Sequence, residues 1–293
     1  MLSPHSILLS PTWILPSAAR PRVSMRFPPA PILTDRALSW NSLEERVLSS
    51  LTGQRLQQEG DLRAAGQGPA HTDAKLRLFD AADESDIEVT FYCDSAAWCP
   101  YCQKVWLLLE EKRIPYRVEK LSLNAYGYKP SWFTRLVDGG KLPAIEIRGE
   151  LIVESFAIME ALDAAFPEHG PQMKPPAGSH EEQFANDMLQ LERELVRDWF
   201  SLTFYPVEGE QLAATRSRFL SSLRRVDAAL GSTAGPWFLG GRAPSIVDLQ
   251  YVSHVERMAA SVLYWKGLDI RRPGDFPNLE RWLGGKCEIR APR

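Results

Sequence analysis

The sequence predicts two folded units, an α/β domain followed by an all-helical domain. A strand pattern from Ile87 to Tyr92 gives way to a helical pattern from Pro100 to about Arg113, and a second strand follows, which is how a βαβ unit begins. After a proline-rich stretch at residues 167–179, only helical patterns remain. A length of 293 residues with 44% hydrophobic residues is sufficient for two domains with substantial cores.

The remaining elements are predicted from periodicity and turn signals. We expect further strands at residues 116–120, 144–147 and 151–153, the last two forming a hairpin. We expect further helices at residues 154–166, 181–204, 211–230, from Ser245 onward, and 278–283. Ser245 and Asp248 form an S-x-x-D cap for the third of the later helices. The predicted folded units are residues 86–167 and 180–284, with an irregular tail at 285–293.

The amino-terminal residues have the composition of an organelle transit peptide. The first 34 residues contain no Asp or Glu, include Arg20, Arg22 and Arg26, and are rich in Ser and Pro. We therefore expect a targeting segment at residues 1–35, with a disordered tail as the alternative. A secretory signal is disfavoured because proline interrupts the apolar run and no basic residue precedes it.

Residues 36–85 are predicted to be a helical lead-in and linker. Ser42 and Glu45 form a capping-box pattern ahead of Val47, Leu48 and Leu51 at helical spacing, which predicts one short amphipathic helix. The polar segment that follows contains several glycines and a proline and is typical of a connector. It offers no catalytic candidate.

Charge and composition exclude some classes of function. The net charge is −3 with acidic and basic residues interspersed, so the chain has no basic footprint and we expect no nucleic-acid partner. No apolar run is long enough to span a bilayer. Four cysteines in a chain of this length do not form a disulfide framework, and they favour redox or metal chemistry in a reducing compartment.

The Cys99-Pro100-Tyr101-Cys102 turn carries the strongest chemical signal. It lies where a strand gives way to a helix, whose first N–H groups have no intrahelical partner. These groups and the helix dipole stabilise a thiolate at Cys99 and lower its pKa. Proline is well suited to the first helical position, and the spacing places Cys102 on the same helical face, within reach of a mixed disulfide.

Several alternatives were weighed for the cysteines. The same spacing would also suit two small buried residues that fill the core, or half of a zinc site. Zinc normally needs four ligands, and the sequence has no second C-x-x-C and no histidine pair to supply the other two. We expect Cys93 to fill the core. Cys102 either resolves a disulfide or packs, and a one-thiol mechanism does not require it. No metal site is expected, and Cys287 is given no catalytic role.

The segment DSAAWCPYCQKVWLLLEEKRIPY, the Leu142-Pro143 step, the Glu154-Ser155 pair and the cap at Ser245 together resemble a glutathione transferase. Among the classes of that family the chain is most similar to the CPYC-bearing iota type of photosynthetic organisms. The resemblance implies a thioredoxin-like glutathione-binding domain at residues 86–167, followed by a helical domain of the transferase type. CPYC alone is also typical of glutaredoxins, but the helical half favours the transferase architecture.

The resemblance also implies roles for individual residues. Cys99 takes the place where other transferases use Ser or Tyr. Leu142, before a cis Pro143, binds the cysteinyl backbone of glutathione, and Glu154 with Ser155 holds its γ-glutamyl end. The remaining candidates for contact with glutathione are Pro100 and Tyr101 in the turn and, placed by general position alone, Lys129 and Lys141 for the glycyl carboxylate.

These roles imply a glutathione-dependent thiol transferase acting in deglutathionylation or dehydroascorbate reduction, with glutathione as co-substrate and a small-molecule or protein disulfide as substrate. A homodimer remains a partner hypothesis. The expected location is the plastid, with the mitochondrion as the alternative. Two other functions are also compatible with the sequence: an isomerase similar to the prostaglandin E synthases, and a non-catalytic protein that binds glutathione or another ligand.

The helical half contributes one aromatic set and one histidine of interest. We expect most of the aromatic set to lie in the core, with a minority reaching a substrate site; it comprises Trp199, Phe200, Phe204, Tyr205, Trp237, Phe238, Tyr264 and Trp265. His254 is predicted to pack in the core or to be hydrogen-bonded there. The tail after Trp282 departs from the family pattern, so part of the pocket wall is predicted to be missing and apolar surface exposed.

Overall fold

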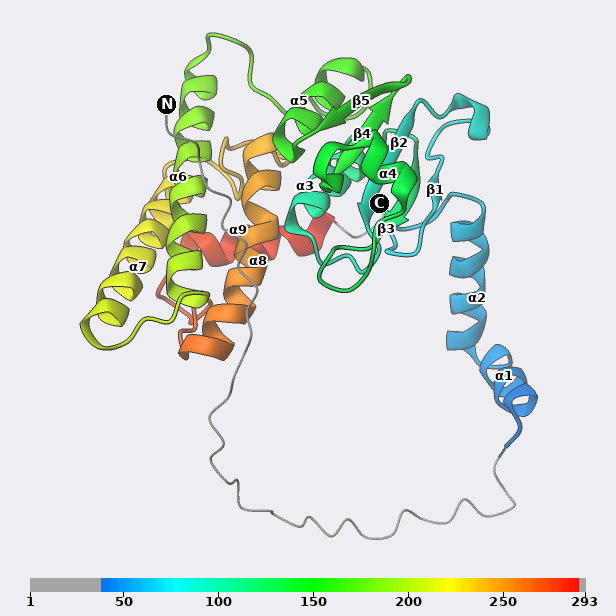
Figure 1. Ribbon diagram of the computed structural model, residues 1–293, viewed down its shortest axis with the longest axis horizontal. Coiled ribbons are helices and arrows are strands. Elements are labelled where there is room, and N and C mark those ends of the chain that lie inside the picture. The colour runs from blue at the N-terminus through cyan, green and yellow to red at the C-terminus, as the bar shows by residue number, and fades with distance from the viewer. Residues whose placement is uncertain (1–37, 290–293) are drawn as a thin grey trace.

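The computed structural model describes the backbone of residues 38–289 and the side chains of residues 38–285. The predicted targeting segment, residues 1–35, lies outside this range. The described chain forms an α/β domain and a helical domain that lie side by side, as the sequence predicts (Figure 1).

A five-stranded sheet forms the centre of the first domain. Its strands are β1 (Leu76–Arg77), β2 (Val89–Asp94), β3 (Tyr116–Leu121), β4 (Ala144–Ile147) and β5 (Glu150–Val153). The strand order is β1-β3-β2-β4-β5. β2 and β3 are parallel because a helix connects them, whereas the other neighbours are antiparallel. Arg148 and Gly149 join β4 to β5 with φ of 54° and 85°, the positive values that a two-residue hairpin favours.

Helices cover both faces of the sheet. They are α3 (Pro100–Lys112), α4 (Ser131–Leu136) and α5 (Ser155–Ala165), with short 3-10 turns η1 (Glu84–Asp86) and η2 (Asp138–Gly140). Alternation along β2 separates two cores: Phe91 and Cys93 join the cluster that contains α3 and α5 residues, and Tyr92 joins Phe133 of α4. The sequence did not predict α4, because its six residues are too few to show helical periodicity.

The second domain consists of four helices within the described residues, α6 (His180–Thr203), α7 (Gly209–Gly231), α8 (Ile246–Lys266) and α9 (Pro277–Ile289). Ser245 and Asp248 form a capping box at the start of α8, as expected. α3 of the first domain packs along α8 in the middle of the molecule (Figure 1). The buried apolar residues of both domains form one continuous cluster.

The expected irregular tail is partly wrong, since α9 continues through residues 285–289. Gly284 and Gly285 suggested a helix end, but glycine within a helix costs only about 1 kcal/mol relative to alanine. Leu279 and Trp282 are both buried, and their packing fixes the helix upstream of the two glycines. The predicted stop therefore does not occur at this point.

The amino-terminal lead-in also differs from the prediction. Two helices form, α1 (Trp40–Leu48) and α2 (Leu51–Ala64), in place of one. The cap of α1 is Ser39, whose hydroxyl accepts the Ser42 N–H at 3.2 Å, so Ser42 lies inside the helix. Further along, β1 adds part of the expected connector to the sheet edge.

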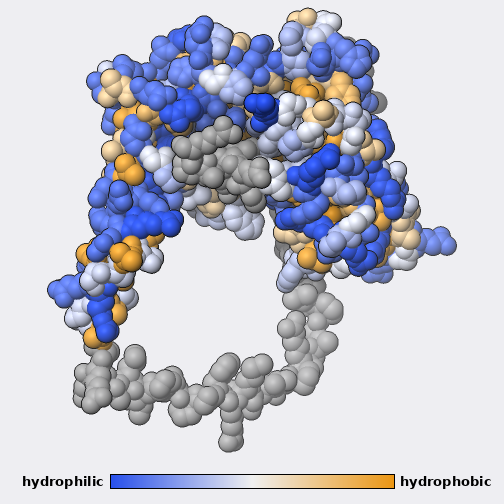
Figure 2. Space-filling model, turned by 180° about the vertical axis from the view of Figure 1, so that it is seen from behind, coloured by the Kyte–Doolittle hydropathy of each residue, from blue (hydrophilic) through white to orange (hydrophobic). Residues whose placement is uncertain are grey.

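The helices α1 and α2 project away from the sheet (Figure 1), and apolar side chains are scattered over them (Figure 2). The exposed apolar residues in and beside them are Leu38, Trp40, Leu43, Val47, Leu48, Leu51, Leu56 and Leu62. Of the residues in the two helices only Gly53 is buried. This segment therefore contributes little to the core of the described chain.

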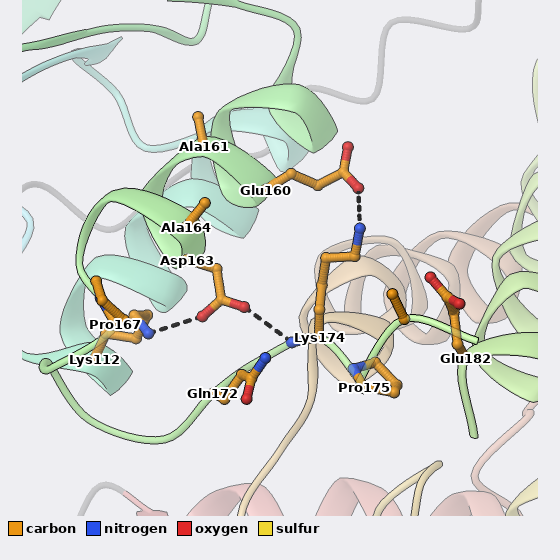
Figure 3. A pocket seen from close by; sticks show the side chains of 11 residues that line it. Lys112, Glu160, Ala161, Asp163, Ala164, Pro167, Gln172, Lys174, Pro175 and Glu182 are labelled. Carbon is orange, nitrogen blue, oxygen red and sulfur yellow. Dashed lines mark hydrogen bonds and ion pairs between the residues drawn. The ribbon is translucent and has the colours of Figure 1, made fainter. Parts of the chain in front are cut away.

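The proline-rich stretch between α5 and α6 is held firmly against the first domain. The Asp163 carboxylate accepts the Lys112 ammonium at 2.7 Å and the backbone N–H groups of Met173 and Lys174 at 3.0 to 3.2 Å (Figure 3). Gly170, with φ of 58°, lies so close that a Cβ there would be 2.7 Å from the Lys112 Cα. The linker thus has a fixed path from one domain to the other.

Candidate active site

Cys99 lies at the N-cap of α3, immediately after the loop that leaves β2. Its backbone is extended, with φ of −67° and ψ of 116°, and Pro100 occupies the first helical turn. No side chain caps this helix. The first N–H groups of α3 are therefore left to the Cys99 sulfur, as the sequence predicts.

The surroundings of Cys99 lower its pKa to about 7. The largest contribution is the hydrogen bond that the Cys102 thiol donates to the Cys99 sulfur, and the N–H groups of Cys102 and Tyr101 add to it. Burial and the negative charge of Asp94 act in the opposite direction. A thiol with this pKa is about half ionised near neutral pH, whereas an ordinary cysteine, with a pKa near 8.5, is only a few per cent ionised.

The neighbouring cysteines have the opposite character. Burial is the main cause that raises the pKa of Cys102, and the Cys99 sulfur raises it further. Burial also raises the pKa of Cys93 to about 12, and this residue lies in the sheet core as expected. All three are free thiols in the structure. Only Cys99 combines an ionised sulfur with residual exposure, at 7% of its surface.

The thiol turn is flanked by two exposed aromatic residues. Trp98 is 73% exposed and Tyr101 is 44% exposed, on either side of the largely covered Cys99. An incoming substrate would therefore meet aromatic surface before it reached the sulfur. The Pro100 ring lies between them in the sequence and starts the helix.

Asp94 organises the turn, and sequence analysis missed this role. Its buried carboxylate accepts the N–H groups of Ala96, Trp98 and Cys99 at 3.1, 2.6 and 2.9 Å. A carboxylate that accepts several N–H groups fixes a loop strongly. Its position five residues before Cys99, at the end of a strand, is the sequence feature from which this role could have been predicted.

The helical domain holds the same turn through Arg257 of α8. The guanidinium donates to the Trp98 carbonyl at 2.7 Å and to the Gln103 side chain at 2.6 Å. Gln103 in turn donates to Glu256 at 2.9 Å. No local pattern indicated these contacts, because they join residues more than 150 positions apart.

The Leu142–Pro143 peptide bond is cis, as the resemblance implies. Ala144, the next residue, pairs with Tyr92 near the end of β2, so the bend lies beside the strand end from which the thiol turn departs. Leu142 also packs against the buried cluster that includes Cys99. The fold therefore brings the bend and the turn to the same end of the sheet (Figure 1).

The same register brings Glu154 and Ser155 to this end of the sheet. Val153 pairs with Ala144, and Glu154 follows as the N-cap of α5 with φ of 70° and ψ of 116°. Ser155 is buried, whereas the Glu154 side chain is 73% exposed. A positive φ at a non-glycine residue is uncommon and is concentrated at functional sites.

The two lysines placed by general position differ in their surroundings. The Lys141 ammonium lies 3.9 Å from the Glu154 carboxylate, with both side chains largely exposed. Lys129 donates to the Asn124 side chain at 3.1 Å, and its stem lies against Gly140, next to Lys141. Lys141 is therefore in direct contact with Glu154, which is predicted to bind glutathione. Lys129 is connected to Glu154 only through its position beside Lys141.

The aromatic set of the helical domain is mostly exposed, so the expectation that most of it would be core is wrong. Trp199, Trp237 and Phe238 are buried, but five of the eight are exposed, namely Phe200, Phe204, Tyr205, Tyr264 and Trp265. The five lie at or beyond the carboxyl-terminal turns of α6 and α8. Helix ends project past their packed neighbours, which explains why apolar composition did not predict burial there.

His254 is buried and hydrogen-bonded, as predicted. Its Nδ1 lies 2.7 Å from the Glu192 carboxylate, and its ring meets that of Tyr101 edge-on at 5.5 Å. Lys104 lies on the same carboxylate at 3.5 Å. Sequence analysis missed both Lys104 and Glu192, since a charged residue on a helix usually faces solvent.

Outside the thiol turn, the described residues form no metal site and no membrane-spanning helix. Among residues 38–285 no cluster of His, Cys, Asp or Glu suits a metal ion. In the described part of the chain, no helix combines the length and apolar character needed to cross a bilayer. A cavity of about 680 Å³ lies at the linker (Figure 3), where Lys112 and Lys174 are already paired with Asp163 and Glu160.

A cysteine-bearing helix start on a thioredoxin-like sheet, followed by an all-helical domain, defines a protein of the glutathione transferase type. Comparisons with known proteins agree. The family model for the glutathione S-transferase N-terminal domain matches residues 98–165, and that for the C-terminal domain matches residues 209–285. The chain therefore belongs to the glutathione S-transferase family.

Individual relatives are distant. Pyrimidodiazepine synthase of Drosophila melanogaster is 30% identical, over 64% of this chain and 73% of that protein. The chloroplastic glutathione S-transferase DHAR3 of Arabidopsis thaliana is 37% identical over 78 residues, which is 27% of this chain and 29% of that protein. The crystal structure of glutathione transferase Omega 3C from Trametes versicolor superposes with a TM-score of 0.58 at 25% identity, covering 68% of this chain and 84% of the other.

Proposed function

We propose that this protein is a glutathione-dependent thiol transferase in which Cys99 forms a mixed disulfide with glutathione. The observation that carries the proposal is the N-cap position of Cys99, where its pKa falls to about 7 while that of Cys102 rises. The thiolate is the form that attacks a disulfide, and the best attacking thiol has a pKa close to the ambient pH. Cys99 meets this condition and Cys102 does not.

The proposed cycle has two exchange steps. In the first, the Cys99 thiolate attacks the glutathione sulfur of a glutathionylated substrate, and the substrate thiolate leaves and takes up a proton. In the second, the thiolate of a free glutathione attacks the Cys99 mixed disulfide, which releases glutathione disulfide and restores the Cys99 thiolate. Overall, the glutathionylated substrate and one free glutathione become the substrate thiol and glutathione disulfide, so one disulfide bond is broken, one is formed, and the proton lost by glutathione is taken up by the substrate thiolate.

Dehydroascorbate reduction is the second reaction within this proposal. Its support is the similarity to DHAR3, which is 37% identical to this chain over 78 residues. Two glutathione molecules would supply the two electrons and two protons, and Cys99 would again carry one glutathione between steps. The CPYC sequence supports, within this proposal, an assignment to the iota-type transferases.

The proposed glutathione site uses the segments that meet at the end of the sheet. Leu142 would pair with the cysteinyl backbone beside Pro143, and Ser155 with the α5 N-terminus would bind the γ-glutamyl carboxylate. Tyr101 and Pro100 would border the sulfur. Lys141, and Lys129 beside it, would face the glycyl carboxylate.

The proposal is tested by mass analysis after incubation with glutathione disulfide. The unaltered chain is expected to gain one glutathione, mapped to Cys99. Cys99→Ser is expected to lose both the adduct and turnover with hydroxyethyl disulfide and glutathione, whereas Cys102→Ser should keep a substantial share. Cys102 donates a hydrogen bond to the Cys99 sulfur, and a serine hydroxyl can donate in its place, so this replacement leaves the nucleophile and a donor beside it. Equal loss from both variants would contradict the one-thiol cycle.

We also propose a plastid location, supported by the composition of residues 1–35 and by the chloroplastic relative DHAR3. A fluorescent protein fused after residue 60 is expected to accumulate in plastids. The same fusion lacking residues 1–35 should stay in the cytosol. Accumulation in mitochondria would support the alternative that the sequence left open.

A further inference from the structure

Three ionisable side chains form a buried cluster beneath the thiol turn. Lys104 belongs to α3, Glu192 to α6 and His254 to α8, so the cluster joins three helices and both domains. All three residues are less than 5% exposed. Lys104 Nζ lies 3.5 Å and His254 Nδ1 lies 2.7 Å from the same carboxylate oxygen, Glu192 Oε1.

A contribution to stability does not by itself explain why these ionisable side chains are buried. Removing ions from water is costly, and a buried pair often contributes no more than well-packed apolar residues of the same volume. The Lys104–Glu192 contact of 3.5 Å is also longer than a close charged hydrogen bond. A buried ammonium in this place calls for a second role, and its position indicates which one.

The Lys104 ammonium lies at the end of α3 that carries Cys99. The two residues are five positions apart, roughly 7.5 Å along a helix axis, but helical side chains tilt toward the amino terminus. The ammonium accordingly lies 5.2 Å from the centre of the Tyr101 ring, in the first turn. Burial lowers the pKa of Lys104, and the Glu192 carboxylate and then the negative charge of the Cys99 sulfur act in the opposite direction, so the ammonium and the sulfur interact electrostatically.

We propose that Lys104 is a positioning residue for the thiol chemistry of Cys99: its buried ammonium, held in place by Glu192 of the helical domain, is the counter-charge of the Cys99 thiolate. This inference rests on the proposed function and deepens it, since it assigns to the helical domain a part in setting the reactivity of the sulfur.

His254 completes the arrangement by leaving the charge on Lys104. Burial and the nearby Lys104 lower the pKa of His254, so that its imidazole is neutral near pH 7 despite the Glu192 hydrogen bond. The other charged groups that act on Cys99 are Asp94 on β2 and Arg257 on α8, which carry opposite charges. These two residues and the Cys102 thiol stay unchanged in the variants below.

The test measures the pKa of Cys99 from the pH dependence of its alkylation by iodoacetamide, with the adduct mapped by peptide mass. Lys104→Met is expected to raise this pKa by about one unit, which is a tenfold loss of thiolate at pH 6. Lys104→Arg keeps the charge and is expected to restore the original value. An unchanged pKa in Lys104→Met, or an equal rise in Lys104→Arg, would overturn the proposal.

A double variant guards against a folding defect. Lys104→Met combined with Glu192→Gln leaves no buried unpaired charge. Its Cys99 pKa is expected to lie between those of the unaltered chain and Lys104→Met, because loss of the carboxylate offsets part of the effect of the lost ammonium. If Lys104→Met does not fold, an unchanged pKa in the double variant contradicts the proposal.

The matched control is Lys112→Met, at the other end of α3. Lys112 is also fully buried and also paired with a carboxylate, that of Asp163. This variant, or Lys112→Met with Asp163→Asn, is expected to lose stability without any shift in the Cys99 pKa. An equal shift in the control would overturn the proposal. Alkylation needs no glutathione, so these outcomes are separate from those of the mixed-disulfide test.

Discussion

The sulfur of Cys99 combines partial burial with a lowered pKa, two properties that usually oppose each other. Burial of a thiol disfavours its charged form and raises the pKa, as Cys93 shows. At Cys99 the Cys102 thiol and two backbone N–H groups outweigh this effect. The result is a sulfur that is about half ionised near neutral pH although only 7% of the residue is exposed.

The first residue-scale prediction concerns pH. Because the folded pKa of Cys99 is about 7, below that of an ordinary cysteine, its thiolate is formed above pH 7 and lost as the pH falls through 7. The rate of alkylation at Cys99 is therefore expected to level off above about pH 8 and to be roughly tenfold lower at pH 6. Peptide mass mapping of timed iodoacetamide reactions gives the profile.

The two other buried thiols are the internal control for this profile. Cys93, with a pKa raised to about 12, and Cys102 should remain unlabelled on the same time scale. Labelling of Cys102 before Cys99 would contradict the assignment of the nucleophile. Counting each cysteine by its own peptide keeps Cys287 separate from the three.

At the scale of single elements, the capping box of α8 contributes more than an ordinary cap. The Asp248 carboxylate accepts the Ser245 N–H and hydroxyl, and also the Phe238 N–H and the Trp282 indole N–H, at 2.7 to 3.1 Å. It thereby joins the start of α8 to the loop before it and to α9. Four donors depend on this one buried side chain.

Asp248→Ala is therefore expected to lower the free energy of unfolding by about 3–5 kcal/mol, because several buried donors lose their acceptor. Urea denaturation followed by circular dichroism measures the change. Asp275→Ala, at an exposed aspartate in the turn before α9, is the matched control and should stay within about 0.5 kcal/mol. Similar losses in both variants would show that the buried contacts of Asp248 do not matter.

The same elements show what a local pattern can and cannot predict. The S-x-x-D pattern at Ser245 forms a capping box because an apolar run follows it and packs in the core. The equivalent pattern at Ser42 does not, because Ser39 offers a cap one turn earlier and α1 has no buried residue to fix its start. A cap predicted from sequence needs the packing that sets the helix boundary.

Strand positions were predicted where burial is regular, as at residues 144–147. The edge strand β1 was missed because it has only two residues, and its burial depends on Arg77 pairing with Glu110 of α3.

The residues of the candidate site likewise include some that the sequence could predict and some that it could not. The helix start at Cys99 was visible in the sequence, whereas Asp94, Arg257 and Glu192 act through contacts that only the folded chain brings together.

On the scale of the whole molecule, the domain interface lies directly beneath the thiol turn. Arg257 holds the Trp98 carbonyl, Glu192 holds Lys104, and His254 packs on Tyr101. The apolar core is also continuous across the interface. A displacement between the domains would therefore move the surroundings of Cys99, which links the stability of the interface to the reactivity of the sulfur.

The last prediction separates the part of the chain that supports this core from the part that projects from it. Deleting residues 1–60 removes α1 and most of α2, which bury only Gly53 against Val47, so the free energy of unfolding should change by less than about 1 kcal/mol.

Deleting residues 1–79 also removes β1 and Arg77. The Arg77 guanidinium gives Glu110 two hydrogen bonds of 2.9 Å, and its loss from a largely buried pair is expected to cost about 3–5 kcal/mol. Urea denaturation of the two shortened chains measures the difference, and Arg77→Met in the full chain should reproduce most of the larger loss. Equal destabilisation by the two deletions would instead place α1 and α2 within the cooperative core.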